Sequence, residues 1–158
     1  MSTDPVHGVK NCNQAIPTDM APYTPKDEAL LAKAQSLQLT VANAIASQSI
    51  QKYVKAMISM ICHANKYIDD MELWVLRKTN VKWMKTVLYV ILEVLRCTAI
   101  LYQPLIPESS NQILDLLAIP PNERTFDDLD AGRVEPGAPI SKPVGVFPRL
   151  EWTETMEA

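Results

Sequence analysis

The sequence predicts an all-α fold, an antiparallel helix bundle with an extended N-terminal arm and a C-terminal strap. The 12 prolines lie before Lys26 or after Leu101, which leaves the middle of the chain free to be helical. In that middle, apolar residues recur every three or four positions, the period of an amphipathic helix. A chain of 158 residues with 47% hydrophobic content fits one domain with a real core. We expect an arm over residues 1–23, a bundle over 24–132 and a strap over 133–158.

The first expected helix runs from about residue 24 to residue 46. Thr24 can act as its N-cap, Pro25 suits the first helical position, and Asp27 completes a capping box. Before Tyr23, pairs that contain proline or glycine discourage helix formation. The positions of the first helix that we expect in the core are Leu30, Leu31, Ala34, Leu37, Val41 and Ile45.

A second helix begins at Ser47 or Ser49, and we expect it to end between Asp69 and Glu72. Acidic residues at a helix C-terminus oppose the macrodipole, so we expect this end to fray into a loop that contains Trp74. The predicted apolar face consists of Ile50, Val54, Met57, Ile58, Ile61, Ala64 and Ile68, widened by Tyr53 and Met60.

The third helix is predicted from Thr79 or Asn80 to about Gln103. Residues 87–92 are apolar all round, as expected for the central helix of a bundle. Glu93 and Arg96 interrupt this stretch before it reaches the ~20 apolar residues of a membrane span, so we expect no contact with a membrane.

A shorter fourth helix is expected from Glu108 to about Ala118, and its inward residues are Ile113, Leu114, Leu116 and Leu117. Residues 125–129 predict one further helical turn, closed by Gly132. The proline-rich strap follows. Its Val144–Pro148 stretch is the part that we expect to reach the core.

The charge is unevenly distributed along the chain. The formal net charge is −3, but residues 49–103 hold eight basic and four acidic residues, which gives +4 there and −7 elsewhere. This asymmetry indicates a middle segment that faces a polyanion. Solvated helix faces with clustered charge are the alternative explanation.

The residue types of an active site do not assemble in this sequence. The four glycines are scattered, so no phosphate-binding loop exists, and His63 lies mid-helix, where a surface role is expected. Asp69 and Asp70 are adjacent and point apart on a helix, so they cannot share a proton. The odd number of cysteines, without metal-ligand spacing, predicts reduced core fillers rather than a disulfide or zinc site: Cys12, Cys62 and Cys97. Judged on its residues alone, the chain is not an enzyme.

The stretch from Asn65 to Trp74 combines the side chains that recognise unpaired RNA bases. Asn65 offers an amide for a base edge, Lys66 a cation for phosphate, and Trp74 an indole on which a base can stack. Asn65 and Asp69 are four residues apart and therefore share a helix face. The alternative is that Trp74 plugs the end of the bundle and that Tyr67 belongs to the core.

Several stretches, in the same order, resemble the anticodon-binding helical domain of methionyl-tRNA synthetases. Members of that family show Asn-[Arg/Lys]-Tyr-[Val/Ile]-Asp and then a tryptophan, a pattern similar to Ala64–Asp69 followed by Trp74. Thr86–Arg96 looks like the next family helix and Gln103–Pro107 like its proline-bounded corner. Val146–Leu150 is similar to the family's Leu-Phe-Pro-Arg end. The resemblance covers most of the chain, about residues 23–152.

This resemblance implies a class Ia anticodon-binding helix bundle that reads the CAU anticodon of methionine tRNA. Trp74 would stack on an anticodon base, Asn65 and Asp69 would shape the pocket, and phosphates would be contacted by the basic residues Lys66, Arg77, Lys78 and Lys82. The family's two nucleotide-binding motifs, His-Ile-Gly-His and Lys-Met-Ser-Lys-Ser, do not occur in the chain. We therefore expect no cofactor here, and we expect a catalytic domain, in cis or in trans, to bind ATP.

Residues Asn122–Phe126 are similar to the mitochondrial branch of the family, which favours the mitochondrial matrix over the cytoplasm. No targeting segment is visible in residues 1–25. A second hypothesis is a non-catalytic homologue that serves as an interaction module in a larger ribonucleoprotein assembly. Leu73 and Glu72, where the family has proline and alanine, favour this alternative, as does the missing Asn/Arg pair of the family's first helix.

Overall fold

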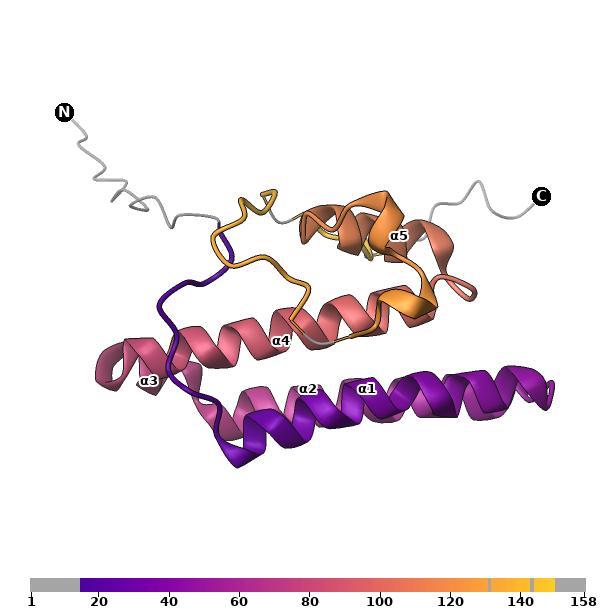
Figure 1. The fold of residues 1–158 in the computed structure, drawn as a ribbon, viewed down its shortest axis with the longest axis horizontal. Helices are drawn as coiled ribbons and strands as arrows, with labels where there is room; N and C mark the ends of the chain where they lie inside the picture. The colour runs from indigo at the N-terminus through magenta and orange to yellow at the C-terminus, as the bar shows by residue number, and fades with distance from the viewer. Residues whose placement is uncertain (1–14, 131, 143, 150–158) are drawn as a thin grey trace.

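The fold is described by a computed structural model over residues 15–130, 132–142 and 144–149. Three long helices, α1 (Pro25–Ala46), α2 (Ile50–Met71) and α4 (Val81–Tyr102), lie along one another, and the shorter α3 (Leu73–Thr79) joins α2 to α4 at one end (Figure 1). At the other end, α5 (Pro107–Leu116) packs on α4 and is followed by two 3-10 turns at 121–123 and 126–128. The described residues contain no strand, so the predicted all-α bundle is confirmed.

Helix α1 begins as the sequence predicts. The backbone N–H and the hydroxyl of Thr24 donate to Asp27 Oδ2 over 2.6 and 2.8 Å, which forms the cap. The expected core positions are buried except for Leu31, which is half-buried, and Ile45, which is 48% exposed. Ala44 is buried in place of Ile45, because the covered face continues from Leu37 and Val41 in steps of three or four residues.

The apolar face predicted for α2 is confirmed only in part. Tyr53, Met57 and Met60 are buried as predicted, and the half-buried positions are Val54, Ala64 and Ile68. Ile50, Ile58 and Ile61 are exposed, whereas the buried residues of this helix are Tyr53, Met57, Met60, Tyr67 and Met71. Helix α2 carries two apolar stripes, and periodicity alone does not say which of them a neighbouring helix covers. The packing of α1 and α4 against α2 selects the stripe of tyrosines and methionines, and the Tyr53 hydroxyl donates to the carbonyl oxygen of Leu101.

Tyr67 joins α2 to the start of α1. Its hydroxyl donates to Asp27 Oδ1 over 2.5 Å, and the Asp27 side chain is fully buried. Burial, and then the hydrogen bond to Asp27, raises the pKa of Tyr67. Tyr67 is therefore a core residue, as the alternative interpretation of the Asn65–Trp74 stretch predicted.

Replacing Tyr67 with phenylalanine is expected to lower the free energy of unfolding by about 1.5–3 kcal/mol. The substitution leaves one oxygen of a buried carboxylate without its donor, and hydrogen bonds to charged groups are worth this much. Urea denaturation measures the change. Tyr102→Phe is the matched control, because the half-buried Tyr102 hydroxyl has no hydrogen bond within the described residues. Equal stabilities for the two variants would contradict the assigned role of Tyr67.

Helix α4 is the central helix, as predicted, and it buries twelve residues. Two of them are charged: Arg96 donates to Glu93 Oε2 over 3.1–3.2 Å, and both side chains are almost fully buried. Arg96 also donates to the backbone carbonyl oxygens of Asp128 and Asp130, each over 2.6 Å. Among the residues described, we find no helix with the length and apolar character needed to cross a membrane.

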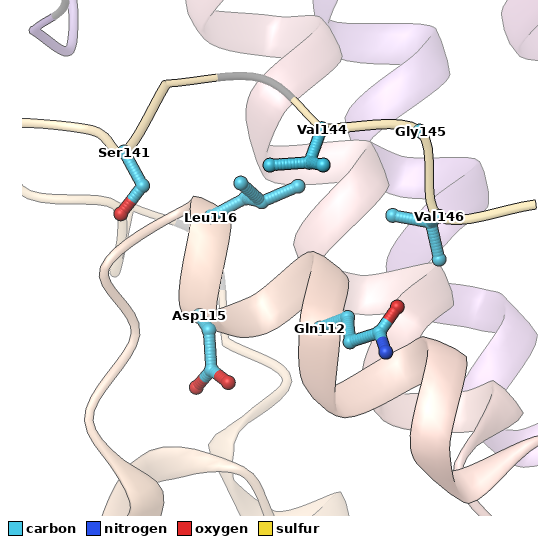
Figure 2. A pocket seen from close by; sticks show the side chains of 7 residues that line it. All are labelled: Gln112, Asp115, Leu116, Ser141, Val144, Gly145 and Val146. Atoms are coloured by element: carbon cyan, nitrogen blue, oxygen red, sulfur yellow. The ribbon is translucent and has the colours of Figure 1, made fainter.

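The strap is held at Val134 rather than at the predicted Val144–Pro148 stretch. The Val134 N–H donates to Glu93 Oε1 over 2.5 Å, and its carbonyl oxygen accepts from the Tyr89 hydroxyl over 2.9 Å. Val144 is 71% exposed and Phe147 67% exposed. Val144 lies over Leu116 at the rim of a shallow pocket of about 360 Å³ (Figure 2). The prediction that the strap reaches the core at Val144–Pro148 was therefore wrong. It rested on apolar composition alone, whereas hydrogen bonds with Glu93 and Tyr89 of α4 hold the strap at Val134.

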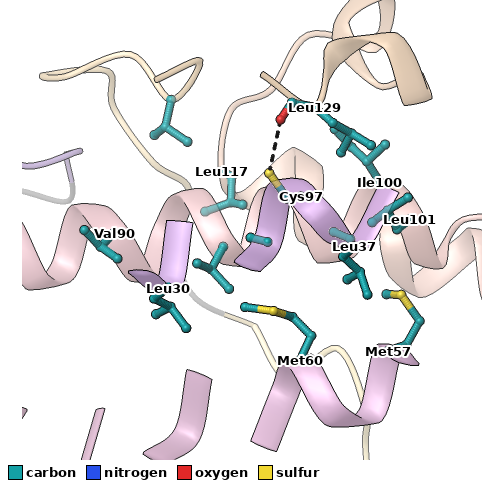
Figure 3. Packing of buried hydrophobic residues seen from close by; sticks show 14 of the residues in the cluster. Leu30, Leu37, Met57, Met60, Val90, Cys97, Ile100, Leu101, Leu117 and Leu129 are labelled. Atoms are coloured by element: carbon teal, nitrogen blue, oxygen red, sulfur yellow. Dashed lines mark hydrogen bonds between the residues drawn. The ribbon is translucent and has the colours of Figure 1, made fainter. Parts of the chain in front are cut away.

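The core lies where α1, α2 and α4 meet, and it extends beneath the strap. Figure 3 shows buried side chains of all three helices in one cluster, among them Leu37 of α1, Met57 of α2 and Leu101 of α4. The described part of the arm also reaches the core: Ile16 is 2% exposed, and its N–H donates to the carbonyl oxygen of Ala138 over 2.9 Å. Arm and strap therefore fold together beside α4, and the rest of the arm, residues 1–14, lies outside the described residues.

Candidate nucleic-acid interface

Glu72 forms the junction between α2 and α3. Its left-handed backbone (φ 43°, ψ 58°) ends α2 and redirects the chain, and its carbonyl oxygen accepts from the N–H groups of Val75 and Leu76 over 2.7 and 3.2 Å. A new helix begins at once, so the predicted loop was wrong. Charges at an exposed helix end cost only about 0.3–1 kcal/mol, and the packing of the half-buried Leu73 and the buried Leu76 outweighs this cost.

Trp74 lies in the first turn of α3, and 60% of it is exposed to solvent. Arg77 and Lys78 follow three and four positions later, so all three side chains share the outer face of this helix. Leu76 points the other way and is buried. Trp74 therefore does not fill the end of the bundle, as the alternative interpretation proposed. Its aromatic ring faces solvent beside two cations.

Asn65, Lys66 and Asp69 are exposed on the last turns of α2, whereas Tyr67 between them is buried. Asn65 and Asp69 therefore share an outward face, as the sequence predicts. The structure brings these residues and α3 to the same end of the bundle (Figure 1).

Lys82, in the first turn of α4, is engaged in a surface ion pair. Its Nζ lies 3.2 Å from Asp19 Oδ1, and the two side chains are 64% and 66% exposed. Such exposed pairs are worth little, about 0–1 kcal/mol, so Lys82 can exchange Asp19 for another anion at small cost. The neighbouring Val81 is 49% exposed, which adds apolar surface beside the cation.

The other reactive side chains have structural surroundings. Cys97 is buried, which raises the pKa of its thiol to about 11, and Cys62 is exposed rather than the core filler that the sequence predicts. Cys12 lies outside the described residues. Across residues 15–130, 132–142 and 144–149, no three His, Cys, Asp or Glu side chains gather as a metal site would require.

The sequence analysis did not predict two features of this end of the bundle. One is the Asp27–Tyr67 hydrogen bond, and the other is a cleft between α1 and α2 that is lined by Lys26, Lys33, His63 and Lys66. The residues of each are 30–40 positions apart in the chain. No local pattern signals such pairs, because only the antiparallel packing of α1 on α2 brings them together.

Comparison with solved structures defines the class of the fold. The chain superposes on the crystal structure of apo Mycobacterium tuberculosis methionyl-tRNA synthetase with a TM-score of 0.85 and 37% identity, covering 91% of this chain and 30% of that one. The fold is thus that of a helical domain of an aminoacyl-tRNA synthetase. Residues 16–157 match the family model of the anticodon binding domain of methionyl tRNA ligase, and the chain belongs to this family.

Curated relatives agree with this assignment. The chain is 42% identical over 142 residues to the methionine–tRNA ligase of Rhizobium meliloti (strain 1021) and 38% identical over 146 residues to that of Mycobacterium tuberculosis (strain ATCC 25618 / H37Rv). These alignments cover 89% and 90% of this chain but only 27% and 28% of the relatives. The chain thus spans about a quarter of the length of the enzymes that it resembles.

Proposed function

We propose that this domain selects methionine tRNA by its anticodon and docks it for aminoacylation by a catalytic domain, present in the same chain or in another. The observation that carries the proposal is the exposed indole of Trp74, on a helix face that also holds Arg77 and Lys78. An aromatic face binds an unstacked base, and adjacent cations bind its phosphates.

The remaining polar residues at this end supply specificity in the proposed mechanism. Asn65 has both a donor and an acceptor for a base edge, and Asp69 accepts only. Phosphate contacts from Lys66, Arg77, Lys78 and Lys82 position the loop without reading its sequence. Because these contacts release counterions, binding is expected to weaken steeply with salt.

Titration of the purified chain with methionine tRNA and with a non-cognate tRNA tests the proposal. We expect tighter binding of methionine tRNA, since phosphate contacts are common to both while base contacts are not. The comparison is made by filter binding at one fixed salt concentration, because affinities at different salt concentrations are not comparable. Equal affinity for both tRNAs would contradict anticodon recognition.

The second candidate function is an interaction module in a larger ribonucleoprotein assembly. This hypothesis predicts equal affinity for methionine tRNA and for a non-cognate tRNA. Leu73 occupies the first helical position of α3, where the family's proline would suit the backbone, and Glu72 adds a negative charge next to Trp74. The mitochondrial matrix stays the predicted compartment, supported by the similarity of Asn122–Phe126 to that branch of the family.

A further inference from the structure

A cleft between α1 and α2 gathers four basic side chains at the end of the bundle that carries Trp74. Lys26 and Lys33 enter it from α1, and His63 and Lys66 enter it from α2. The volume of the cleft is about 400 Å³. From His63 to Met71, the last residue of α2 that lines the cleft, this helix advances about 12 Å at its rise of 1.5 Å per residue.

His63 makes two close polar contacts, one to its own helix and one to α1. Its Nδ1 lies 2.6 Å from the carbonyl oxygen of Ser59, and its Nε2 lies 2.6 Å from the Nζ of Lys33. A carbonyl oxygen only accepts and an ammonium group only donates, so Nδ1 carries the proton and Nε2 accepts. His63 therefore holds the Lys33 ammonium at the cleft without placing a carboxylate beside it.

The positive charge of the cleft is not balanced by acidic side chains. Asp70 is the one carboxylate among the described residues that line it. Within the part of the chain that the structure covers, none of the ion pairs involves Lys26, Lys33 or Lys66. Three ammonium groups thus face one carboxylate, which leaves an excess of positive charge that attracts an anion.

Building on the proposed function, we infer that this cleft binds a phosphodiester group of the RNA strand whose anticodon loop reaches Trp74. The start of α1 and the short α3 lie at the same end of the bundle (Figure 1). Flexible lysines can surround a phosphate from both helices, while His63 keeps one of them in place. The cleft contributes affinity that is independent of base sequence, and Trp74 with its neighbours contributes the reading of bases.

The test compares two double variants of the chain. Lys33→Gln/Lys66→Gln removes two charges from the cleft, and Lys52→Gln/Lys55→Gln removes two exposed charges from the first half of α2. Each is titrated across a salt series with a CAU stem-loop RNA and with the same stem carrying another anticodon. Circular dichroism checks that both variants are folded.

For the cleft variant we expect the slope of log K against log salt to become shallower by about 1.4, since each lost contact to single-stranded RNA removes about 0.7. The change should be the same for both RNAs, and the control variant should keep the wild-type slope. A wild-type slope in the cleft variant overturns the inference, and with it the phosphate contact assigned to Lys66. Anticodon recognition at Trp74 stands if the wild-type chain still discriminates between the RNAs.

Other outcomes separate phosphate binding in the cleft from anticodon recognition at Trp74. If the wild-type chain binds both RNAs equally and the cleft variant has the shallower slope, the cleft binds phosphate and anticodon recognition is refuted. Equal loss of slope in both double variants refutes a localised site, because charge anywhere on α2 would then suffice. A wild-type chain that binds neither RNA overturns both.

Discussion

Replacing Arg96 with methionine is expected to lower the free energy of unfolding by about 3–5 kcal/mol, the largest effect of any single change that we foresee. The substitution removes the partner of a buried carboxylate, and breaking a buried ion pair from one side costs this much. It also removes the donors to the carbonyl oxygens of Asp128 and Asp130. The turn that precedes the strap would lose its attachment to α4.

Thermal and urea denaturation measure this effect. For a domain of about 150 residues, a loss of this size corresponds to a fall in Tm of about 10 °C or more. Arg77→Met is the matched control, because Arg77 is exposed and surface changes usually stay within about 0.5 kcal/mol. Similar stabilities for the two variants would show that the buried pair does not hold the strap.

A double variant separates charge from packing at this site. Glu93→Gln/Arg96→Met removes both charges but keeps an oxygen that can accept from the Val134 N–H. Because the unpaired charge is the main penalty of the single variant, the double variant should recover part of the lost stability. No recovery would indicate that the hydrogen bonds from Arg96 to the backbone carbonyls matter more than its pairing with Glu93.

Replacing Trp74 with alanine is expected to weaken binding of a CAU stem-loop by about 1–3 kcal/mol, the value of one base stacked on an aromatic ring. The indole is 60% exposed, so the fold should be unaffected and the free energy of unfolding should change by no more than about 0.5 kcal/mol. Fluorescence anisotropy with labelled RNA measures the affinity, and urea denaturation measures the stability of the same preparation.

Two further variants make the Trp74 result specific. Trp74→Phe keeps an aromatic face and should retain part of the affinity, since stacking needs a π surface rather than the indole N–H. Val75→Ala trims the next exposed residue of α3, 41% exposed, and should leave binding unchanged. If Trp74→Ala binds as tightly as the wild-type chain, Trp74 is not the stacking platform, whatever the rest of the domain does.

Local sequence signals determined much of this fold. Thr24 and Asp27 placed the start of α1, and Asn80 placed the start of α4, where its side-chain oxygen accepts from the Trp83 N–H over 3.1 Å. Capping depends on residues three positions apart, so a single chain segment contains the whole signal. The order of motifs along the chain likewise sufficed to predict the family.

Tertiary contacts decided what remained. Ile58 and Met57 are adjacent and both apolar, and only the packing of α1 and α4 determines that Met57 is buried and Ile58 exposed. In the same way Val134 and Val144 are both strap valines, yet only Val134 meets the hydrogen-bonding groups of Glu93 and Tyr89. Burial is a property of the neighbours as much as of the residue itself, so hydrophobicity alone cannot assign it.

At the candidate interface, too, some features follow from the sequence and others only from the tertiary structure. The sequence by itself determined which residue types are available near Asn65–Trp74 and that they suit an unpaired nucleotide. The structure decided that Trp74 faces solvent on a helix, that Tyr67 is committed to Asp27, and that Lys33 and Lys66 share a cleft. The physical reason is that charge and stacking act through space, and the antiparallel packing of α1 on α2 brings together groups that are some 30 to 40 residues apart in the chain.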